Sequence, residues 1–203
     1  MDTGETIFIV DDDAAILDGL SNLLESLGMN TELYATAEDF FAHWNASRAG
    51  CLVLDVRLPG MTGVEFQEKL RQAGSALPII FMTAHGDIPM VRKVMKSGAI
   101  EFLTKPFPKE ELLHAIEQAL SMDRTHRREE EAINSIRTRI DALTGREREV
   151  MSLVTAGLLN KQIASDLNLS EIMVKLHRRH VMEKMQAASL ADLVRMCERV
   201  KTF

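Results

Sequence analysis

The chain has 203 residues, a 46% hydrophobic content and a formal net charge of −6, enough apolar material for one large packed domain or two small ones. No apolar run approaches the roughly 18 to 20 residues that span a bilayer, and the N-terminal residues are too acidic for a signal peptide. We therefore expect a cytoplasmic protein without a membrane partner, in which Cys51 and Cys197 are reduced thiols.

Charge is divided unevenly along the chain. Residues 1–120 hold 9 Lys and Arg against 18 Asp and Glu, whereas residues 121–203 hold 15 against 12. An acidic first part suits a cation or a phosphoryl-transfer site, and a mildly basic second part permits a nucleic-acid partner. We expect the two parts to have different functions.

The first part alternates short apolar runs with amphipathic stretches, which is typical of repeated β-α units around a parallel sheet. The predicted strands are 7–10, 31–34, 51–54, 79–82 and 100–103. The predicted helices are 14–27, 37–45, 64–72, 87–96 and 109–120, with Gly28, Gly74 and Gly98 at three of the helix ends. Five parallel strands with helices on both faces make a doubly wound α/β domain.

The charged composition of residues 121–142 and the spacing of their apolar residues predict a helical linker. Ile133, Ile136, Ile140 and Leu143 recur at 3-4-3 spacing, the seam of a helix that packs on something. A solvated linker helix and a dimerising coiled segment are both open interpretations, because about one and a half heptads is too short to decide between them.

Residues 143–203 predict a small all-α domain of four helices. The helices are expected at 145–156, 161–167, 171–185 and 190–200. Side chains that favour helix starts stand before them: Thr144 with Glu147, Asn160, Ser170, and Ser189 with Asp192.

Polar side chains follow four of the predicted strands, at the point where each strand ends. They are Asp11, Asp12 and Asp13, then Asp55, Thr83 and Lys105. Because parallel strands end at the same edge of a sheet, we expect these side chains to converge. Asp13 also suits the cap of the helix that begins near Ala14, so it is the member least needed by a site.

The residue types in this cluster predict phosphoryl-transfer chemistry. Clustered carboxylates attract a hard cation such as Mg²⁺, and the carboxylate of Asp55 can attack a phosphoryl group to give an acyl phosphate. Lys105 would neutralise charge on that group, and the hydroxyl of Thr83 would donate to it. Pro106 would fix the turn after Lys105, for which a cis peptide bond is one candidate geometry.

In the last part, the helices at 161–167 and 171–185 have the arrangement of a helix-turn-helix. The predicted inner side of the second helix holds Val174, His177, Val181 and Met185, and the other side holds Lys175, Arg178, Arg179 and Met182. The basic side is suited to DNA, with a merely solvated surface as the alternative. His177 is expected to be a packed histidine rather than a ligand.

Four segments, IFIVDDD, LVLDVRLPGMTG, IIFMTAHGD and FLTKPF, resemble the receiver domain of two-component response regulators, which has a flavodoxin-like fold. The resemblance covers about residues 6–120. It implies that Asp55 accepts a phosphoryl group from a sensor histidine kinase. It also implies an acidic pocket of Asp11 and Asp12, in which Asp12, Asp55 and the backbone carbonyl of Arg57 hold Mg²⁺ or another divalent cation.

The same resemblance assigns a switch to this domain. It implies Thr83 as the switch hydroxyl, Lys105 as the phosphate-contacting lysine and Phe102 as the aromatic side chain that changes rotamer. The run HGDIPM after Thr83 is similar to the branch of nitrogen-fixation regulators and regulators of aromatic-hydrocarbon catabolism. In that branch the phosphorylated receiver forms a homodimer, here through about Pro89 to Phe102.

The segments LTGREREV, GLLNKQIA, SEIMVKLHRRHVMEKM and SLADLVR resemble the LuxR-type helix-turn-helix. By that resemblance Lys175, Leu176 and Arg179 approach bases, and Lys161 and Arg178 hold phosphates. Met173 departs from the family, which commonly has Thr there, and Ile172 is apolar where the family is often polar.

Together these features predict a response regulator with a receiver domain (1–120), a helical linker (121–142) and a DNA-binding domain (143–203). We expect it to bind promoter DNA and regulate transcription, with RNA polymerase as a further candidate partner. It is not expected to be an enzyme, beyond promoting its own phosphotransfer and dephosphorylation. The alternatives are an aspartyl-phosphate phosphatase, for which the first part has no obvious substrate cap, and an interaction module or phosphate relay.

Overall fold

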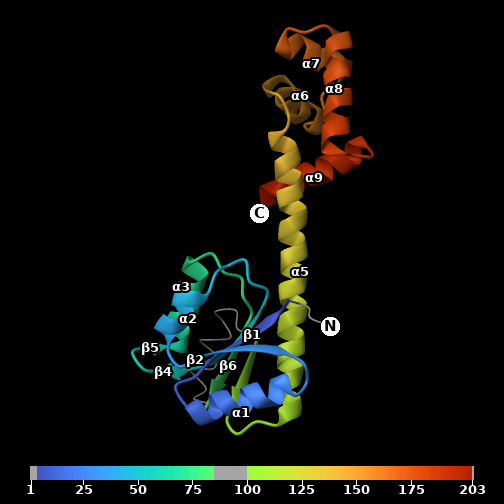
Figure 1. Ribbon diagram of the computed structural model, residues 1–203. Coiled ribbons are helices and arrows are strands. Elements are labelled where there is room, and N and C mark those ends of the chain that lie inside the picture. The colour runs from blue at the N-terminus through green and yellow to red at the C-terminus, as the bar shows by residue number, and fades with distance from the viewer. Residues whose placement is uncertain (1–3, 85–99, 203) are drawn as a thin grey trace. The chain divides into compact units, whose positions relative to one another are not determined.

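The computed structural model describes residues 4–84 and 100–202, and side chains as far as residue 200. It divides into two compact units, Met1–Arg127 and Arg128–Phe203, the first α/β and the second helical (Figure 1). The predicted helix at 87–96, its stop at Gly98 and most of the segment from Pro89 to Phe102 lie outside the described residues. Within the described residues, no helix is long and apolar enough to cross a membrane.

A parallel sheet of five strands forms the centre of the first unit (Figure 1). Its strands are β1 (Thr6–Val10), β2 (Asn30–Tyr34), β3 (Gly50–Asp55), β6 (Ile79–Thr83) and β7 (Glu101–Thr104), in the order β2-β1-β3-β6-β7. This is the flavodoxin-like order, and it confirms the predicted doubly wound fold. The chain reverses direction across the sheet between β1 and β3, which is where ligands of such sheets bind.

Helices cover both faces of the sheet. The helix α1 (Ala14–Glu25) and the start of α5 (Lys109–Asp141) pack on one face, where Leu24 and Ile116 are fully buried. The helices α2 (Ala37–His43) and α3 (Gly63–Gln72) pack on the other, where the rings of Phe40 and Phe66 lie 5.2 Å apart. The central strands read as continuous apolar runs because both of their faces are buried.

A short antiparallel ribbon, β4 (Arg57–Leu58) with β5 (Met61–Thr62), follows β3 and was not predicted. Its turn contains Gly60, whose φ of 78° favours glycine. Leu58 and Met61 are buried in the core on the α2 and α3 side. Thr62 then begins α3 in a capping box with Glu65.

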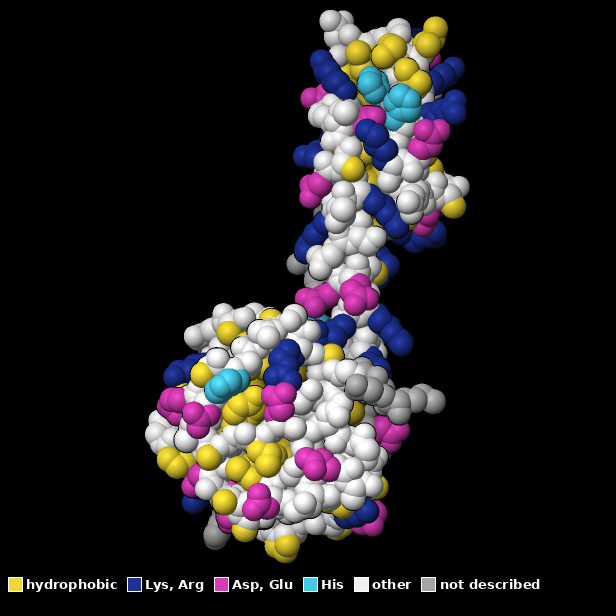
Figure 2. Space-filling view, viewed as in Figure 1, with side chains coloured by type: hydrophobic (Ala, Val, Ile, Leu, Met, Phe, Trp, Pro, Cys, Tyr) yellow, Lys and Arg dark blue, Asp and Glu magenta, His cyan; other side chains and the backbone are white. Residues whose placement is uncertain are grey.

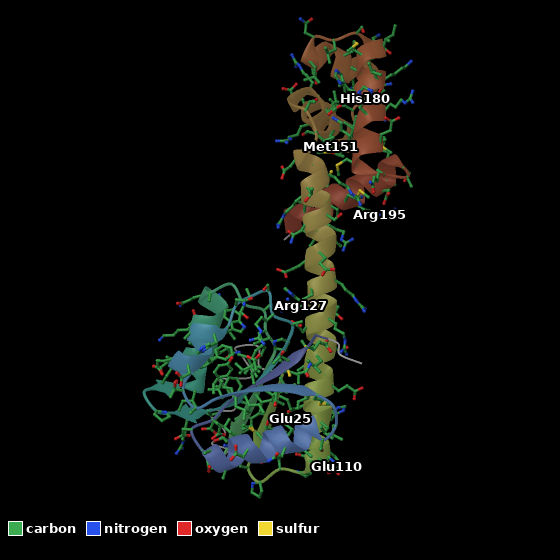
Figure 3. The ribbon with its side chains drawn as sticks, viewed as in Figure 1. Glu25, Glu110, Arg127, Met151, His180 and Arg195 are labelled. Atoms are coloured by element: carbon green, nitrogen blue, oxygen red, sulfur yellow. The ribbon has the colours of Figure 1, made fainter. Side chains whose placement is uncertain are left out.

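The helix α5 does not end at Leu120 as predicted but continues to Asp141, over 33 residues. Its continuation is bonded to the first unit at the N-terminal edge of the sheet. Asp123, 3% exposed, accepts hydrogen bonds from Gly50 N–H (3.0 Å) and Arg127 Nε (2.8 Å) through Oδ2. Arg127, labelled on α5 in Figure 3, also donates to the backbone carbonyls of Ser47 and Arg48.

The second unit comprises the end of α5 with α6 (Gly145–Thr155), α7 (Asn160–Leu167), α8 (Glu171–Met185) and α9 (Leu190–Thr202). Ile136 and Leu143 of the predicted seam are buried in one cluster with Val181, Met185 and other residues of α6, α8 and α9. The seam therefore packs within its own chain, so the helix is not simply solvated and its apolar side is not free for a coiled coil.

Helix starts in this unit follow the predicted caps with one exception. Thr144 forms a capping box with Glu147, and Ser170 accepts a hydrogen bond from Met173 N–H at 3.2 Å. The prediction that Asn160 is an N-cap was wrong. Asn160 is the first helical residue of α7, and Leu159 is the N-cap residue. The N–H of Leu159 donates to Oε1 of Gln162 at 2.8 Å.

Candidate functional site

The C-terminal edge of the sheet contains a pocket of about 380 Å³. Its walls are formed by Asp11, Asp12, Asp13, Ile16, Asp55, Arg57, Thr83, Ala84 and Lys105. The structure therefore brings together every residue predicted at the strand ends. Phe102 does not line this pocket; it is half-buried and packs against the core on the α2 and α3 side.

Lys105 is shared by two carboxylates in this pocket. Its Nζ lies 3.0 Å from Asp55 Oδ1 and 2.5 Å from Asp11 Oδ2. The other oxygen of Asp55, Oδ2, accepts a hydrogen bond from Arg57 N–H at 2.9 Å. The carboxylate of Asp55 is thus oriented from both sides, while 11% of its side chain stays exposed to the pocket.

The register of the sheet places Asp55, Thr83 and Lys105 at the C-terminal ends of neighbouring strands. Asp55 ends β3 beside Met82 of β6, and Thr83 pairs with Thr104 at the ends of β6 and β7. The amide of Lys105 then donates to the carbonyl of Thr83 at 2.7 Å, which fixes where the lysine leaves the sheet. The Lys105–Pro106 peptide bond is cis, as considered from the sequence.

Asp11 is the most enclosed carboxylate of the pocket, at 1% exposed. Burial raises its pKa above the usual 3.8, against hydrogen bonds from Lys105 and from the amide of Asp13 that lower it. Burial alone would lower the pKa of Lys105, but its bonds to Asp11 and Asp55 outweigh burial and hold it above 10.5. Lys105 therefore stays charged and offsets part of the negative charge of the two carboxylates.

The carboxylate oxygens of the pocket are ligands of the kind that Mg²⁺ prefers. Within residues 4–84 and 100–200, no three His, Cys, Asp or Glu side chains lie close enough together to hold a metal ion as they stand. The ammonium group of Lys105 lies between Asp11 and Asp55 and offsets part of their negative charge. The residues fit a divalent cation by their chemistry, with Asp12 exposed at the rim.

Asp13 has the structural role expected of it. Its side chain accepts from Ala15 N–H at 2.9 Å and caps α1, and it also lines the pocket.

The second unit contains the predicted helix-turn-helix, formed by α7 and α8. Val174, Val181 and Met185 on the inner side of α8 are almost fully buried, as predicted, and His177 is half-buried. Met182 was wrongly placed on the basic side: it is half-buried and packs against the cluster of α6, α8 and α9.

The predicted DNA-binding residues differ in their surroundings. Lys161 and Lys175 are exposed, and Leu176 is 42% exposed. Arg179 is exposed and paired with Glu183 at 2.8 Å. Arg178 is half-buried and donates to Asn160 Oδ1 at 2.7 Å, which ties α8 to the start of α7.

Sequence reasoning gave too little weight to apolar side chains on this surface. Ile172 is 77% exposed and Leu159 is 70% exposed. Ile172 is apolar where the LuxR pattern is often polar, and Leu159 was not among the predicted site residues. The sequence signal for exposed apolar side chains was present: Leu159 stands at the turn before α7, and Ile172 stands on the outer side of α8.

Comparison with known proteins gives one match for each unit. Residues 7–117 match the response regulator receiver domain, and residues 141–197 match the LuxR family of bacterial regulatory proteins.

Whole-length relatives share both parts. The chain is 44% identical over 200 residues to the response regulator protein TodT of Pseudomonas putida, covering 98% of this chain and 88% of TodT. It is 40% identical over 199 residues to the transcriptional regulatory protein FixJ of Bradyrhizobium diazoefficiens, covering 98% and 97%. The solved structure of the response regulator StyR, 46% identical, covers 97% of this chain and 100% of StyR with a TM-score of 0.86.

Proposed function

This chain belongs to the response regulators that join a receiver domain to a LuxR-type DNA-binding domain, and from this premise we propose that phosphorylation of Asp55 controls DNA binding by α8. The proposed domains are residues 1–120, 121–142 and 143–203. The observation that carries the proposal is the position of Asp55, a partly exposed carboxylate oriented by Arg57 N–H and by Lys105.

Asp55 would act as a nucleophile toward the phosphohistidine of a sensor kinase. A carboxylate oxygen forms the bond to phosphorus, and the bond from phosphorus to the histidine nitrogen breaks, leaving its electron pair on that nitrogen. Lys105 already contacts both Asp55 and Asp11, so its ammonium can bond a phosphoryl oxygen while Asp11 still holds it. When bound, Mg²⁺ would be held by Asp12, Asp55 and the carbonyl of Arg57 beside Asp11, supplying positive charge to the transferring group.

The added group changes the charge at the sheet edge by up to about two units. Thr83, at the end of β6, would donate its hydroxyl to the phosphoryl group, and Phe102, one strand away on β7, would change rotamer with it. The segment from about Pro89 to Phe102 would then become a homodimer surface, and phosphorylation would shift the balance between two existing states. We assign the receiver no turnover of other substrates, only its own phosphotransfer and dephosphorylation.

The DNA-binding part of the proposal rests on α8. Lys175, Leu176 and Arg179 on its outer side would contact bases. Lys161 on α7 and Arg178, whose guanidinium also donates to Asn160 Oδ1, would hold phosphates. Two such helices in a homodimer would bind a two-fold site in promoter DNA, next to which RNA polymerase could be contacted. The steep salt dependence of phosphate contacts distinguishes this function from a protein-interaction module.

The phosphoacceptor assignment is tested by labelling the full chain with acetyl phosphate and Mg²⁺ and measuring intact mass. Asp55→Asn should abolish phosphate uptake, whereas Asp18→Asn, an exposed carboxylate on α1, should leave it unchanged. If Asp55→Asn takes up phosphate at the wild-type rate, another residue is the acceptor. Continuous turnover of small phosphomonoesters would favour a phosphatase instead.

A further inference from the structure

The outer side of α8 begins with hydrophobic side chains. Ile172 is 77% exposed and Leu176, one helical turn later, is 42% exposed, with Met173 beside them at 39%. Leu159, at the start of α7, is 70% exposed. Figure 2 shows hydrophobic side chains together with Lys and Arg at the end of this unit that carries α7 and the start of α8.

Helical spacing puts two of these residues at the middle of the exposed face. Ile172, Leu176, Arg179 and Glu183 are spaced at i, i+4, i+7 and i+11, so they share one side of the helix. The buried Val174 lies on the opposite side. Toward the N-terminus of α8 this central line is therefore apolar, and its first cation, Arg179, is paired with Glu183.

The charges around this apolar line identify its partner. Lys175 and Lys161 are exposed nearby on the same two helices, and cations flanking a narrow apolar strip fit a polyanion better than an apolar protein groove. Among the groups that DNA bases present in the major groove, the methyl group of thymine is the apolar one. An isoleucine without hydrogen-bonding atoms can select only such a group.

We propose that Ile172 and Leu176 read thymine methyl groups in the major groove, so that this helix selects its sites largely by apolar contact. The proposal rests on the DNA-binding function proposed above and specifies its ligand. Lys161 would supply affinity through phosphates, and Ile172 and Leu176 would supply the preference for thymine. Met173 lies beside this line and can adapt its unbranched side chain to a neighbouring base.

The test uses the full chain, treated with acetyl phosphate, and a DNA site selected with it from a random pool. Each thymine of that site is replaced in turn by deoxyuridine, which lacks the methyl group and keeps the same hydrogen-bonding groups. Fluorescence anisotropy should show about fourfold weaker binding for each contacted methyl group, as expected for one methyl removed from water. At other positions the replacement should have no effect.

Variants assign the effect to residues. Ile172→Ser and Leu176→Ala, both at exposed positions where folding is not at risk, should bring the ratio of thymine to uracil affinity close to one at the positions they contact. The matched control, Lys161→Ala, removes an exposed cation of α7 and should weaken binding to both sites equally and lower the salt dependence by about one phosphate contact, leaving that ratio unchanged.

Two results would overturn this inference and leave DNA binding in place. One is a selected site in which no deoxyuridine replacement weakens binding. The other is a thymine preference that survives in both Ile172→Ser and Leu176→Ala, which would assign the reading of the methyl groups to other residues. Failure to select any DNA would instead contradict the proposed function itself.

Discussion

Replacing Asp123 by Ala should destabilise the first unit although Asp123 lies at the edge of the sheet opposite the pocket. The carboxylate is 3% exposed and bonds both Gly50 N–H, at the start of β3, and Arg127 Nε. Its removal leaves a buried amide without an acceptor and a guanidinium without its carboxylate.

The magnitude follows from those two losses. An unsatisfied buried amide costs about 1–3 kcal/mol. Breaking a fully buried ion pair costs about 3–5 kcal/mol, but Arg127 is 25% exposed and keeps its bonds to two backbone carbonyls, so the lower part of that range applies. The two losses share one carboxylate and do not add in full, so we expect a total of about 3–4 kcal/mol. Asp123→Asn, which can still accept from Gly50, should cost less.

Native-state hydrogen exchange on the full chain, read by mass spectrometry, measures this directly. Peptides from β1 and β3 should lose protection in Asp123→Ala, and peptides from α8 should not, because they belong to the other unit. The control is Glu117→Ala, an exposed residue on α5, which should change stability by less than about 0.5 kcal/mol. Equal protection in Asp123→Ala and Glu117→Ala would refute this reasoning.

Three further results are expected. Gly50→Ala should prevent the first unit from folding normally, since a Cβ there would lie 1.8 Å from the carbonyl oxygen of Thr6; a soluble variant with the wild-type circular dichroism spectrum and melting temperature would contradict this. Ile136→Ala, which empties a buried position in the second unit, should cost that unit about 2–5 kcal/mol by hydrogen exchange of α8, and unchanged protection would contradict it. Hydrogen bonds from Lys184 and from the amide of Thr144 lower the pKa of Glu147 from 4.5 to about 2, so its stabilisation is present above pH 4.5 and lost as pH falls toward 2. Glu147→Gln should therefore flatten the acid sensitivity of α6 amide signals in NMR between those pH values, and an unaltered acid transition would count against this role.

Much of the first unit could be predicted because its signals are local. Buried strands are recognised as short apolar runs, and the residues that follow parallel strands lie at one edge of the sheet. The convergence of Asp55, Thr83 and Lys105 could therefore be predicted from the sequence. The ribbon β4–β5 escaped because strands of two residues have no periodicity to detect.

Contacts across long sequence distances were not predictable. Gly50 and Asp123 are 73 residues apart, and nothing in either local sequence indicates their hydrogen bond. Residues 121–142 were predicted to be a helical linker, but not to continue the helix 109–120 without a break, because a charged run does not show where one helix ends and another begins. Arg178 stands at the boundary between the two sides of α8, where helical spacing cannot decide that it turns inward to Asn160.

A titration of the full chain tests most directly whether a phosphoryl group on Asp55 controls DNA binding. Binding to a selected DNA site is measured with and without acetyl phosphate, for the wild type and for Asp55→Asn. We predict that phosphorylation tightens binding by the wild type and that Asp55→Asn does not respond. An unchanged affinity in fully phosphorylated wild type, or an equal response in Asp55→Asn, would contradict the account.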